Sequence, residues 1–344
     1  MSTSSQSYPM SGGDDQHSYI HNSSYQKAVI DGVEEKARQY ILEKNNLLNL
    51  MKPDLSIFTI ANYGCSIGPN TFHAVQSITD TVKLKHMKER QEISLVPLEF
   101  QVCFNDQANN DFNTLFRTQP PSFEQEYFSV GVPGSFYGRV LPRNSIHIGH
   151  TSYTTHWLSK VPEHVCDKKS PAWNKNYIHC NNLIEEVTEA YKVQFRKDMS
   201  VFLKARAEEL VPEGLMIALG ELFICFIFIF LYLQGVTTLE KIELFSMPMY
   251  FPQYSELKRA IEQNGSFTIE MMETTSHPLE ALQLTNDFIT LMFGAFLSTM
   301  IEKHFGDFVV DELFDQLAKK LLKHPIDFEK CKKNMVYYII LKRK

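Results

Sequence analysis

A glycine-containing loop at residues 61–70 carries the side chains whose chemistry is most informative. It reads Ala61-Asn-Tyr-Gly-Cys-Ser-Ile-Gly-Pro-Asn70 and follows a short β-rich run. Gly64 and Gly68 lack a Cβ, so the backbone there can approach a ligand closely. If a helix begins directly after the loop, its free amide groups can bind a nucleoside-type cofactor. Taken alone, the G-x-x-x-G spacing is also common in plain connecting turns.

Two further patches, each at the end of a predicted strand, favour a cofactor site. Asn105-Asp106 follows the second strand-like run, where an acidic side chain could bridge two ribose hydroxyl groups. Gly134-Ser135-Phe136-Tyr137 follows the third, where a ring could face an adenine and a hydroxyl could reach its edge. Taken singly, the first patch could be an exposed loop acid and the second a turn with buried aromatic residues.

Strands and helices alternate along the chain around these patches. Apolar runs predict strands at 55–61, 98–104, 127–132, 145–149, 214–220, 267–271 and 335–341. Apolar positions at helical spacing predict helices at 28–50, 71–87, 111–116, 181–210, 278–304 and 308–324. The alternation indicates an α/β fold with a doubly wound sheet. We therefore expect the turns near 64, 106 and 135 to converge around one ligand.

Composition and charge limit the classes of function. The chain has 344 residues, of which 44% are hydrophobic and 22% charged, and its formal net charge is -6. This apolar content supports a packed core, and the acidic balance disfavours binding to nucleic acid, which depends on neutralising phosphates. We expect a globular protein that acts on a small molecule.

The cysteines and the N-terminal residues bear on the compartment. The six cysteines include no C-x-x-C pair, and their spacing matches neither a zinc module nor a disulfide framework. Free, mostly buried thiols in a reducing compartment are therefore expected. Residues 1–24 show neither the apolar segment of a secretory signal nor the arginine-rich character of a transit peptide, which predicts a cytoplasmic location.

A run of twelve consecutive apolar residues, from Leu222 to Leu233, breaks the alternation. A membrane-spanning helix needs about 20 apolar residues. Extending this run back to that length includes Gly220 and Glu221. A membrane segment is thus the lesser alternative, and no membrane partner is expected.

Five ordered stretches resemble the plant SABATH family of S-adenosylmethionine (SAM)-dependent methyltransferases, which includes salicylate, jasmonate and caffeine-type enzymes. They are Gly64-Cys-Ser-Ile-Gly-Pro-Asn70, Asn105-Asp106 with Asn110-Asp-Phe-Asn113, Val132-Pro-Gly-Ser-Phe-Tyr-Gly-Arg139 with Pro142-Arg-Asn144, His150-Thr-Ser-Tyr-Thr-Thr-His-Trp-Leu-Ser-Lys-Val-Pro162, and His17-Ser-Tyr-Ile-His-Asn-Ser-Ser-Tyr-Gln26. The resemblance runs from about Pro9 to Gly220 and from Val236 to the C-terminus. It implies a Rossmann-like methyltransferase sheet with a helical cap, and a homodimer.

The resemblance also implies roles for individual residues. The cofactor contacts would be Tyr19, Ser23, Gly64, Cys65, Asn70, Asp106, Ser135 and Phe136. The acceptor contacts would be Gln26, Tyr153, His156 and Trp157, with Gln26 and Trp157 holding a carboxylate. A magnesium ion would lie at Asn174, Glu243 and Phe245, where only Asn174 and Glu243 offer a side-chain oxygen and Ser246 follows Phe245.

This chemistry needs little acid–base help from the protein. A sulfonium methyl is already activated, and a carboxylate acceptor is ionised near neutral pH. Catalysis can then come from holding the reacting atoms in line, so no general base is expected. Neutral donors such as Gln26 and Trp157 orient a carboxylate without lowering its nucleophilicity as a cation would, although Trp157 could also be a plain core residue.

The predicted organisation has four parts. Residues 1–27 form a flexible lead that contributes to the active site, and 28–220 form the SAM-binding core with interspersed cap elements. Residues 221–235 are the atypical apolar segment, and 236–344 supply cap helices and the final strands. The preferred acceptor is a small plant carboxylic acid. An N-methyltransferase of a xanthine-like ring, suggested by His156, and a catalytically impaired cofactor-binding homologue are the alternatives.

The chain departs from the family pattern at three places. Asn62-Tyr63 stands where relatives carry Asp-Leu before Gly-Cys, so a negative charge is lost, and Ile67 replaces a serine. The apolar run replaces a mixed-polarity segment that walls the acceptor pocket in relatives, and the chain is shorter across that join. We interpret this run as a gene-model artefact or a recently altered copy, and we expect weak or no activity if it is real.

Overall fold

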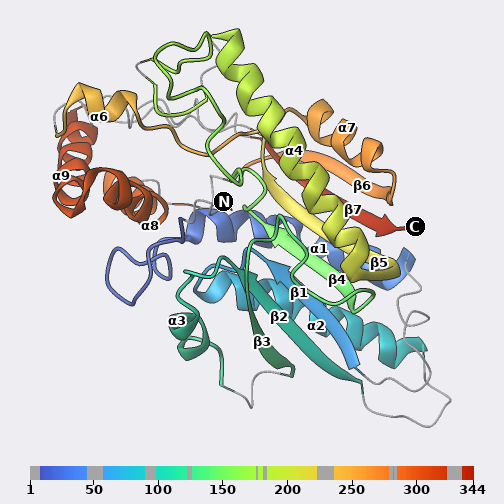
Figure 1. The fold of residues 1–344 in the computed structure, drawn as a ribbon. Coiled ribbons are helices and arrows are strands. Elements are labelled where there is room, and N and C mark those ends of the chain that lie inside the picture. The colour runs from blue at the N-terminus through green and yellow to red at the C-terminus, as the bar shows by residue number, and fades with distance from the viewer. Residues whose placement is uncertain are drawn as a thin grey trace.

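The computed structural model describes residues 8–44, 57–89, 98–121, 126–175, 177–180, 184–222, 236–278, 282, 285–323 and 335–344. A seven-stranded sheet with helices on both faces forms the centre of the molecule (Figure 1). The predicted doubly wound α/β architecture is thus confirmed. Residues 223–235, which hold most of the predicted apolar segment, lie outside the described residues.

The sheet has the strand order β3-β2-β1-β4-β5-β7-β6. The strands are β1 (Ile57–Tyr63), β2 (Glu99–Asp106), β3 (Phe128–Pro133), β4 (Ile146–Ser152), β5 (Leu210–Glu221), β6 (Phe267–Ser276) and β7 (Met335–Arg343). Neighbours among the first five strands pair in parallel, and β7 is antiparallel to both β5 and β6. Strands β2 and β3 follow β1 on one side, and β4 and β5 lie on its other side. This switch between β1 and β4 places a ligand crevice at the carboxyl ends of these strands.

Two pairs of helices cover the two faces of the sheet (Figure 1). On one face lie α1 (Ser24–Lys44) and α2 (Pro69–Glu89), and on the other lie α4 (Glu185–Glu209) and α7 (Tyr254–Asn264). Because successive strand residues point to opposite faces, Ile60 packs with α1 and α2 whereas Tyr63 packs on the α4 side. The predicted apolar stripe of the long helix, including Tyr191 and Phe195, is buried against the sheet.

A third apolar cluster joins the short helix α6 (Leu239–Glu243) to α8 (Asn286–Phe305) and α9 (Asp307–Lys323). These helices group together away from the strands and correspond to the predicted cap (Figure 1). Helix α8 begins later than the predicted residue 278, because Thr285 caps it by accepting a hydrogen bond from the Phe288 amide at 3.1 Å. Two short helices, α6 and α7, were not predicted.

The N-terminal lead contacts both the cap and the helix that follows β2. The Ser11 amide donates to the Ala295 carbonyl of α8 at 2.8 Å. The Gly13 amide donates to the carboxylate of Asp111, which caps the short helix α3 (Phe112–Arg117), at 3.1 Å. The lead therefore joins the cap to the sheet along residues 8–23.

The cysteines in the described part of the chain agree with the expectation of free thiols. Cys65, Cys103, Cys166 and Cys180 are free, and the first two are buried. None of the helices in the described ranges combines the length and apolar character that a membrane crossing needs.

Candidate cofactor and acceptor site

The glycine loop after β1 is held in a conformation that requires Gly64. This residue has φ +74°, and a Cβ added to it would lie 2.0 Å from Cγ2 of Thr154. The Gly64 and Cys65 amides both donate to the Asn105 carbonyl, at 2.8 and 2.9 Å. At Gly68 (φ +102°) a Cβ would lie 3.1 Å from the Ile20 backbone. The loop is thus packed between β2 and the N-terminal lead, with α2 starting directly behind it.

Asp106 ends β2 beside this loop. Its carboxylate accepts hydrogen bonds from the Ser66 amide at 2.6 Å and from the Gln107 amide at 2.7 Å. Burial raises the pKa of Asp106 to about 6, although these two amide donors lower it. A buried carboxylate that is oriented by backbone amides is suited to accept hydrogen bonds from ligand hydroxyl groups.

The turn after β3 contacts the end of β2 and lies close to the glycine loop after β1. The Gly134 amide donates to the Asp106 carbonyl at 2.8 Å, and the Asn105 side chain donates to the Gly134 carbonyl at 2.9 Å. A Cβ at Gly64 would lie 3.6 Å from Cε1 of Phe136, so Phe136 and Gly64 are close neighbours. The three predicted turns therefore converge at one edge of the sheet.

Six of the predicted site residues line a single small cavity, part of it open to solvent: Tyr19, Gln26, Gly64, Cys65, Asn70 and Tyr153. The N-terminal lead closes one side of it, because the Asn70 amide donates to the Ser23 carbonyl at 2.8 Å. Asn62, one of the departures from the family pattern, also lines the cavity and bonds to Thr71 and His150. Asp106 lies at the adjoining end of β2, and Ser135 and Phe136 lie in the turn after β3.

Buried polar atoms near the cavity indicate a ligand. Among the described residues, no hydrogen-bond partner is present for Oε1 of Gln26, Oγ of Ser66, Oδ1 of Asn105 or the hydroxyl of Tyr153. Because buried polar groups are nearly always hydrogen-bonded, a ligand with several polar groups is expected there. The glycine cradle and the oriented Asp106 carboxylate fit the adenosyl part of SAM.

The acceptor residues divide into two groups. Gln26 and Tyr153 line the cavity, whereas His156 and Trp157 lie side by side with ring centroids 5.7 Å apart, outside its lining. His156 stacks on Phe251 at 5.0 Å, and burial lowers its pKa to about 3, so its imidazole is neutral. Trp157 pairs with Met249 in an isolated β-bridge. The loop after β4 thus reaches from the cavity to the cap.

Comparison with known proteins identifies the family. Residues 5–344 match the family model described as SAM dependent carboxyl methyltransferase. The chain belongs to this family. The resemblance to SABATH methyltransferases is therefore confirmed, and the protein is a SAM-dependent methyltransferase acting on small metabolites.

Individual relatives agree with this assignment. The methyltransferase is 74% identical to a probable S-adenosylmethionine-dependent methyltransferase of Arabidopsis thaliana, over 100% of both chains. It is 41% identical to loganic acid O-methyltransferase of Catharanthus roseus, over 99% of this chain and 96% of the relative. A solved structure of loganic acid methyltransferase with S-adenosylhomocysteine (SAH) matches with a TM-score of 0.87 and 39% identity, over 98% of this chain and 99% of that one.

The alignment with the Arabidopsis relative spans 362 positions, whereas the methyltransferase has 344 residues. The relative therefore carries residues that this chain lacks.

The predicted magnesium residues make protein contacts instead. The Asn174 amide donates to the His179 carbonyl at 2.9 Å, and the carboxylate of Glu243 pairs with Lys168 at 2.7 Å. Phe245 is buried against the Phe305 ring. Since Lys168 already neutralises the single carboxylate of this set, the set does not favour Mg²⁺. The metal at Asn174, Glu243 and Phe245 stays a prediction.

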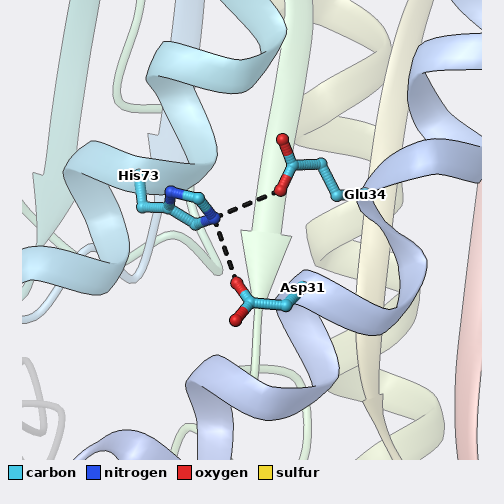
Figure 2. A group of neighbouring side chains, drawn as sticks. All are labelled: Asp31, Glu34 and His73. Atoms are coloured by element: carbon cyan, nitrogen blue, oxygen red, sulfur yellow. Dashed lines mark ion pairs between the residues drawn. The ribbon is translucent and has the colours of Figure 1, made fainter.

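A different cluster of potential ligands lies on α1 and α2 (Figure 2). His73 Nε2 is 3.0 Å from a carboxylate oxygen of Asp31 and 3.1 Å from one of Glu34. Lys27 also pairs with Asp31, at 2.6 Å. All of these side chains are at least one-third exposed. We interpret them as surface ion pairs that join the two helices.

Sequence reasoning missed one buried network that supports the methyltransferase site. Arg206 and Glu209 are fully buried and form a salt bridge of 2.9 Å. The guanidinium of Arg206 also donates to the Phe136 carbonyl at 2.6 Å, and Glu209 accepts from the Tyr63 hydroxyl at 2.7 Å. The network thus fixes the turn that carries Ser135 and Phe136. Its one sequence signal is a charged i, i+3 pair at the end of an otherwise apolar helix stripe.

Proposed function

We propose that this methyltransferase converts a small plant carboxylic acid to its methyl ester. The observation that carries the proposal is the chemistry of the cavity. Its described lining contains no lysine, arginine, aspartate or glutamate, and burial lowers the pKa of its one histidine, His150, to about 4. Neutral donors such as Gln26 would orient an acceptor carboxylate while leaving its charge free to attack.

The roles of individual residues follow the resemblance. Bound SAM supplies a methyl group activated by its sulfonium. Asp106 would accept hydrogen bonds from the ribose hydroxyls, and Phe136 would contact the adenine, with Tyr19, Ser23, Gly64, Cys65, Asn70 and Ser135 completing the cofactor contacts. Gln26 and Trp157 would hold the acceptor carboxylate, beside Tyr153 and His156. In-line positioning would provide the rate enhancement without a general base.

The proposal is tested by binding and turnover together. We expect SAH to raise the melting temperature, and we expect the protein to transfer a labelled methyl group from SAM to at least one member of a carboxylic acid panel, with the ester identified by mass spectrometry. Gln26→Ala should lower kcat/KM about 10- to 100-fold, because it removes a hydrogen bond to a charged group. Gln76→Ala, which removes an exposed glutamine bonded to Asp80 on α2, is the control.

The other outcomes have clear meanings. SAH binding without transfer to any acid or xanthine would favour the impaired homologue, and transfer to a xanthine alone would favour N-methylation. Sequencing the transcript across residues 215–240 tests the gene-model hypothesis, because an in-frame apolar run would rule out the artefact.

We further propose a cytoplasmic homodimer, which the family resemblance supports. Light scattering of the purified protein and imaging of a fluorescent fusion would test the two parts separately.

A further inference from the structure

Glu221 is a buried carboxylate at the carboxyl end of β5 that the transfer chemistry does not use. Its side chain is fully buried, and its Oε1 accepts a hydrogen bond from the Tyr25 hydroxyl at 2.5 Å. Its Oε2 has no hydrogen-bond partner among the described residues. An unpaired polar atom at such a depth is costly, which points to a ligand group that satisfies it.

The contacts of Tyr25, and those between Tyr153 and β5, place Glu221 beside the acceptor region. Tyr25, its partner, directly precedes Gln26 in α1. The Tyr25 ring lies edge-on to the Tyr153 ring with centroids 6.4 Å apart. The Tyr153 amide bonds to the Leu219 carbonyl of β5 at 3.0 Å, so Tyr153 and the end of β5 are adjacent. Tyr153 lines the cavity, and its buried hydroxyl also lacks a partner in the described structure.

The charges around Glu221 restrict what could bind there. None of the described residues sets a positive charge against it, and burial raises its pKa to about 8. His277 stacks on Tyr25 at 3.9 Å, but burial lowers its pKa to about 4, so it is neutral. The nearby tyrosines are neutral as well, since burial raises the pKa values of Tyr153 and Tyr337. A ligand carboxylate placed beside Glu221 would therefore have no cation to pair with.

The unpaired groups suit a ligand hydroxyl. A hydroxyl group can donate one hydrogen bond and accept another. The Tyr153 hydroxyl can donate, and the free oxygen of Glu221 can accept when ionised or donate when protonated. An alkyl or aryl carbon at the same place would leave both groups unpaired.

We propose that Glu221 and Tyr153 form a second polar subsite that binds a hydroxyl group of the acceptor, with Tyr25 positioning the Glu221 carboxyl. The acceptor is therefore a hydroxylated acid, recognised through its carboxylate by Gln26 and through its hydroxyl by this pair. The inference rests on the proposed function for the carboxylate end.

Calorimetric binding of matched acids to the SAH-loaded protein tests the subsite. The probes are benzoic acid with its 2-, 3- and 4-hydroxy forms, and cinnamic acid with its hydroxylated forms. In the wild type, at least one hydroxylated acid should bind about 10- to 100-fold more tightly than its hydroxyl-free parent. Glu221→Leu should reduce this ratio of affinities to less than about threefold, because only the binding of the hydroxylated acid is weakened. Glu221→Gln should keep part of the preference for the hydroxylated acid.

A second Tyr–Glu pair, whose tyrosine also lies on α1, supplies the control. Tyr40 of α1 donates to Glu270 of β6 at 2.9 Å. Tyr25→Phe should lower the hydroxyl preference by releasing Glu221, whereas Tyr40→Phe should leave it unchanged. If Glu221→Leu does not fold, Glu221→Gln and Tyr25→Phe decide the question.

The inference is overturned if the wild type binds none of these acids, if every hydroxylated acid binds within threefold of its parent, or if the Glu221 and Tyr25 variants keep the wild-type ratio. Ester formation is scored separately by mass spectrometry. Acids that bind with the expected preference but are never methylated would uphold the subsite and contradict the proposed function.

Discussion

The Ser66 amide and the Asp106 carboxylate are joined by a hydrogen bond of 2.6 Å between the loop after β1 and the end of β2. This bond crosses two neighbouring parallel strands at their carboxyl ends, where Tyr63 and Asn105 stand in register. The carboxylate is thereby oriented before any ligand arrives. Preorganisation of this kind lowers the cost of binding.

The first prediction concerns the pH dependence of cofactor affinity. Asp106 has a pKa of about 6 because it is buried, and its ionised form is the better acceptor for ligand hydroxyl groups. We therefore expect the affinity for SAH to be constant above about pH 7 and to fall by up to tenfold per pH unit below about pH 6. Isothermal titration calorimetry between pH 5 and 8 would measure it.

Asp106→Asn is the matched variant for that experiment. It should bind SAH about 10- to 100-fold more weakly at pH 7.5, because a hydrogen bond to a charged group is lost. Its affinity should vary less with pH across the same range. A wild-type affinity that stays the same from pH 7 to pH 5 would contradict the assignment of Asp106.

The second prediction separates backbone strain from steric contact at Gly64. Gly64 and Gly265 share φ +74°, but an added Cβ at Gly265 meets nothing within 4 Å, whereas at Gly64 it lies 2.0 Å from Thr154. Gly265→Ala should cost about 1 to 2 kcal/mol of unfolding free energy from conformational strain alone. Gly64→Ala should cost more and should abolish SAH binding. Urea unfolding and thermal shift with SAH would check both, and equal losses in the two variants would refute the close packing.

The third prediction concerns the buried pair Arg206–Glu209. Arg206→Ala would leave Glu209 as a buried carboxylate, although the Tyr63 hydroxyl and the Val140 and Leu141 amides still donate to it. Removal of one partner from a buried pair costs about 3 to 5 kcal/mol, and the remaining donors favour the lower end of that range. SAH affinity should also fall, because the Phe136 carbonyl loses its anchor.

Arg196→Ala is the control for Arg206→Ala. Arg196 pairs with Glu189 on the same helix, but both side chains are about half exposed. Exposed ion pairs contribute little to stability, so this variant should unfold at nearly the wild-type denaturant concentration. Similar losses in the two arginine variants would count against a supporting role for the buried network.

The fourth prediction uses the raised pKa of Glu221. The folded value is about 8 against 4.5 for the free side chain, so the folded state binds more protons than the unfolded state between these values. The stability contributed by Glu221 should therefore fall as pH rises, by on the order of 1 kcal/mol per pH unit in that window.

Glu221→Gln cannot ionise, so its stability relative to wild type should rise from pH 5 to pH 8 and then level off. Denaturant unfolding of the two proteins at pH 5, 6.5, 8 and 9 would measure the difference. If the stability difference between the two proteins does not change with pH, Glu221 cannot be a buried carboxyl that lacks a neighbouring cation.

Local sequence information accounts for much of the fold. The alternation of strands and helices follows from apolar periodicity, and the residues around Gly64 predict a close turn before a helix because glycine alone fits there. The motifs at 64–70, 105–106 and 134–137 predict the cofactor site, and the structure brings these turns together. The cap was less predictable: α8 begins at its Thr285 cap rather than at 278, and α6 and α7 were missed because short helices carry few turns of periodicity.

The sequence by itself determined the family, the strand-loop-helix order and the residue types at the cofactor turns, because these depend on local backbone requirements. Only the tertiary structure decided which distant side chains meet. The burial of Glu221 against Tyr25, the Arg206–Glu209 network under Phe136 and the packing of residues 8–23 between sheet and cap depend on contacts between residues far apart in the chain. No local pattern encodes such contacts, since they arise from how whole elements pack and from which polar groups that packing removes from water.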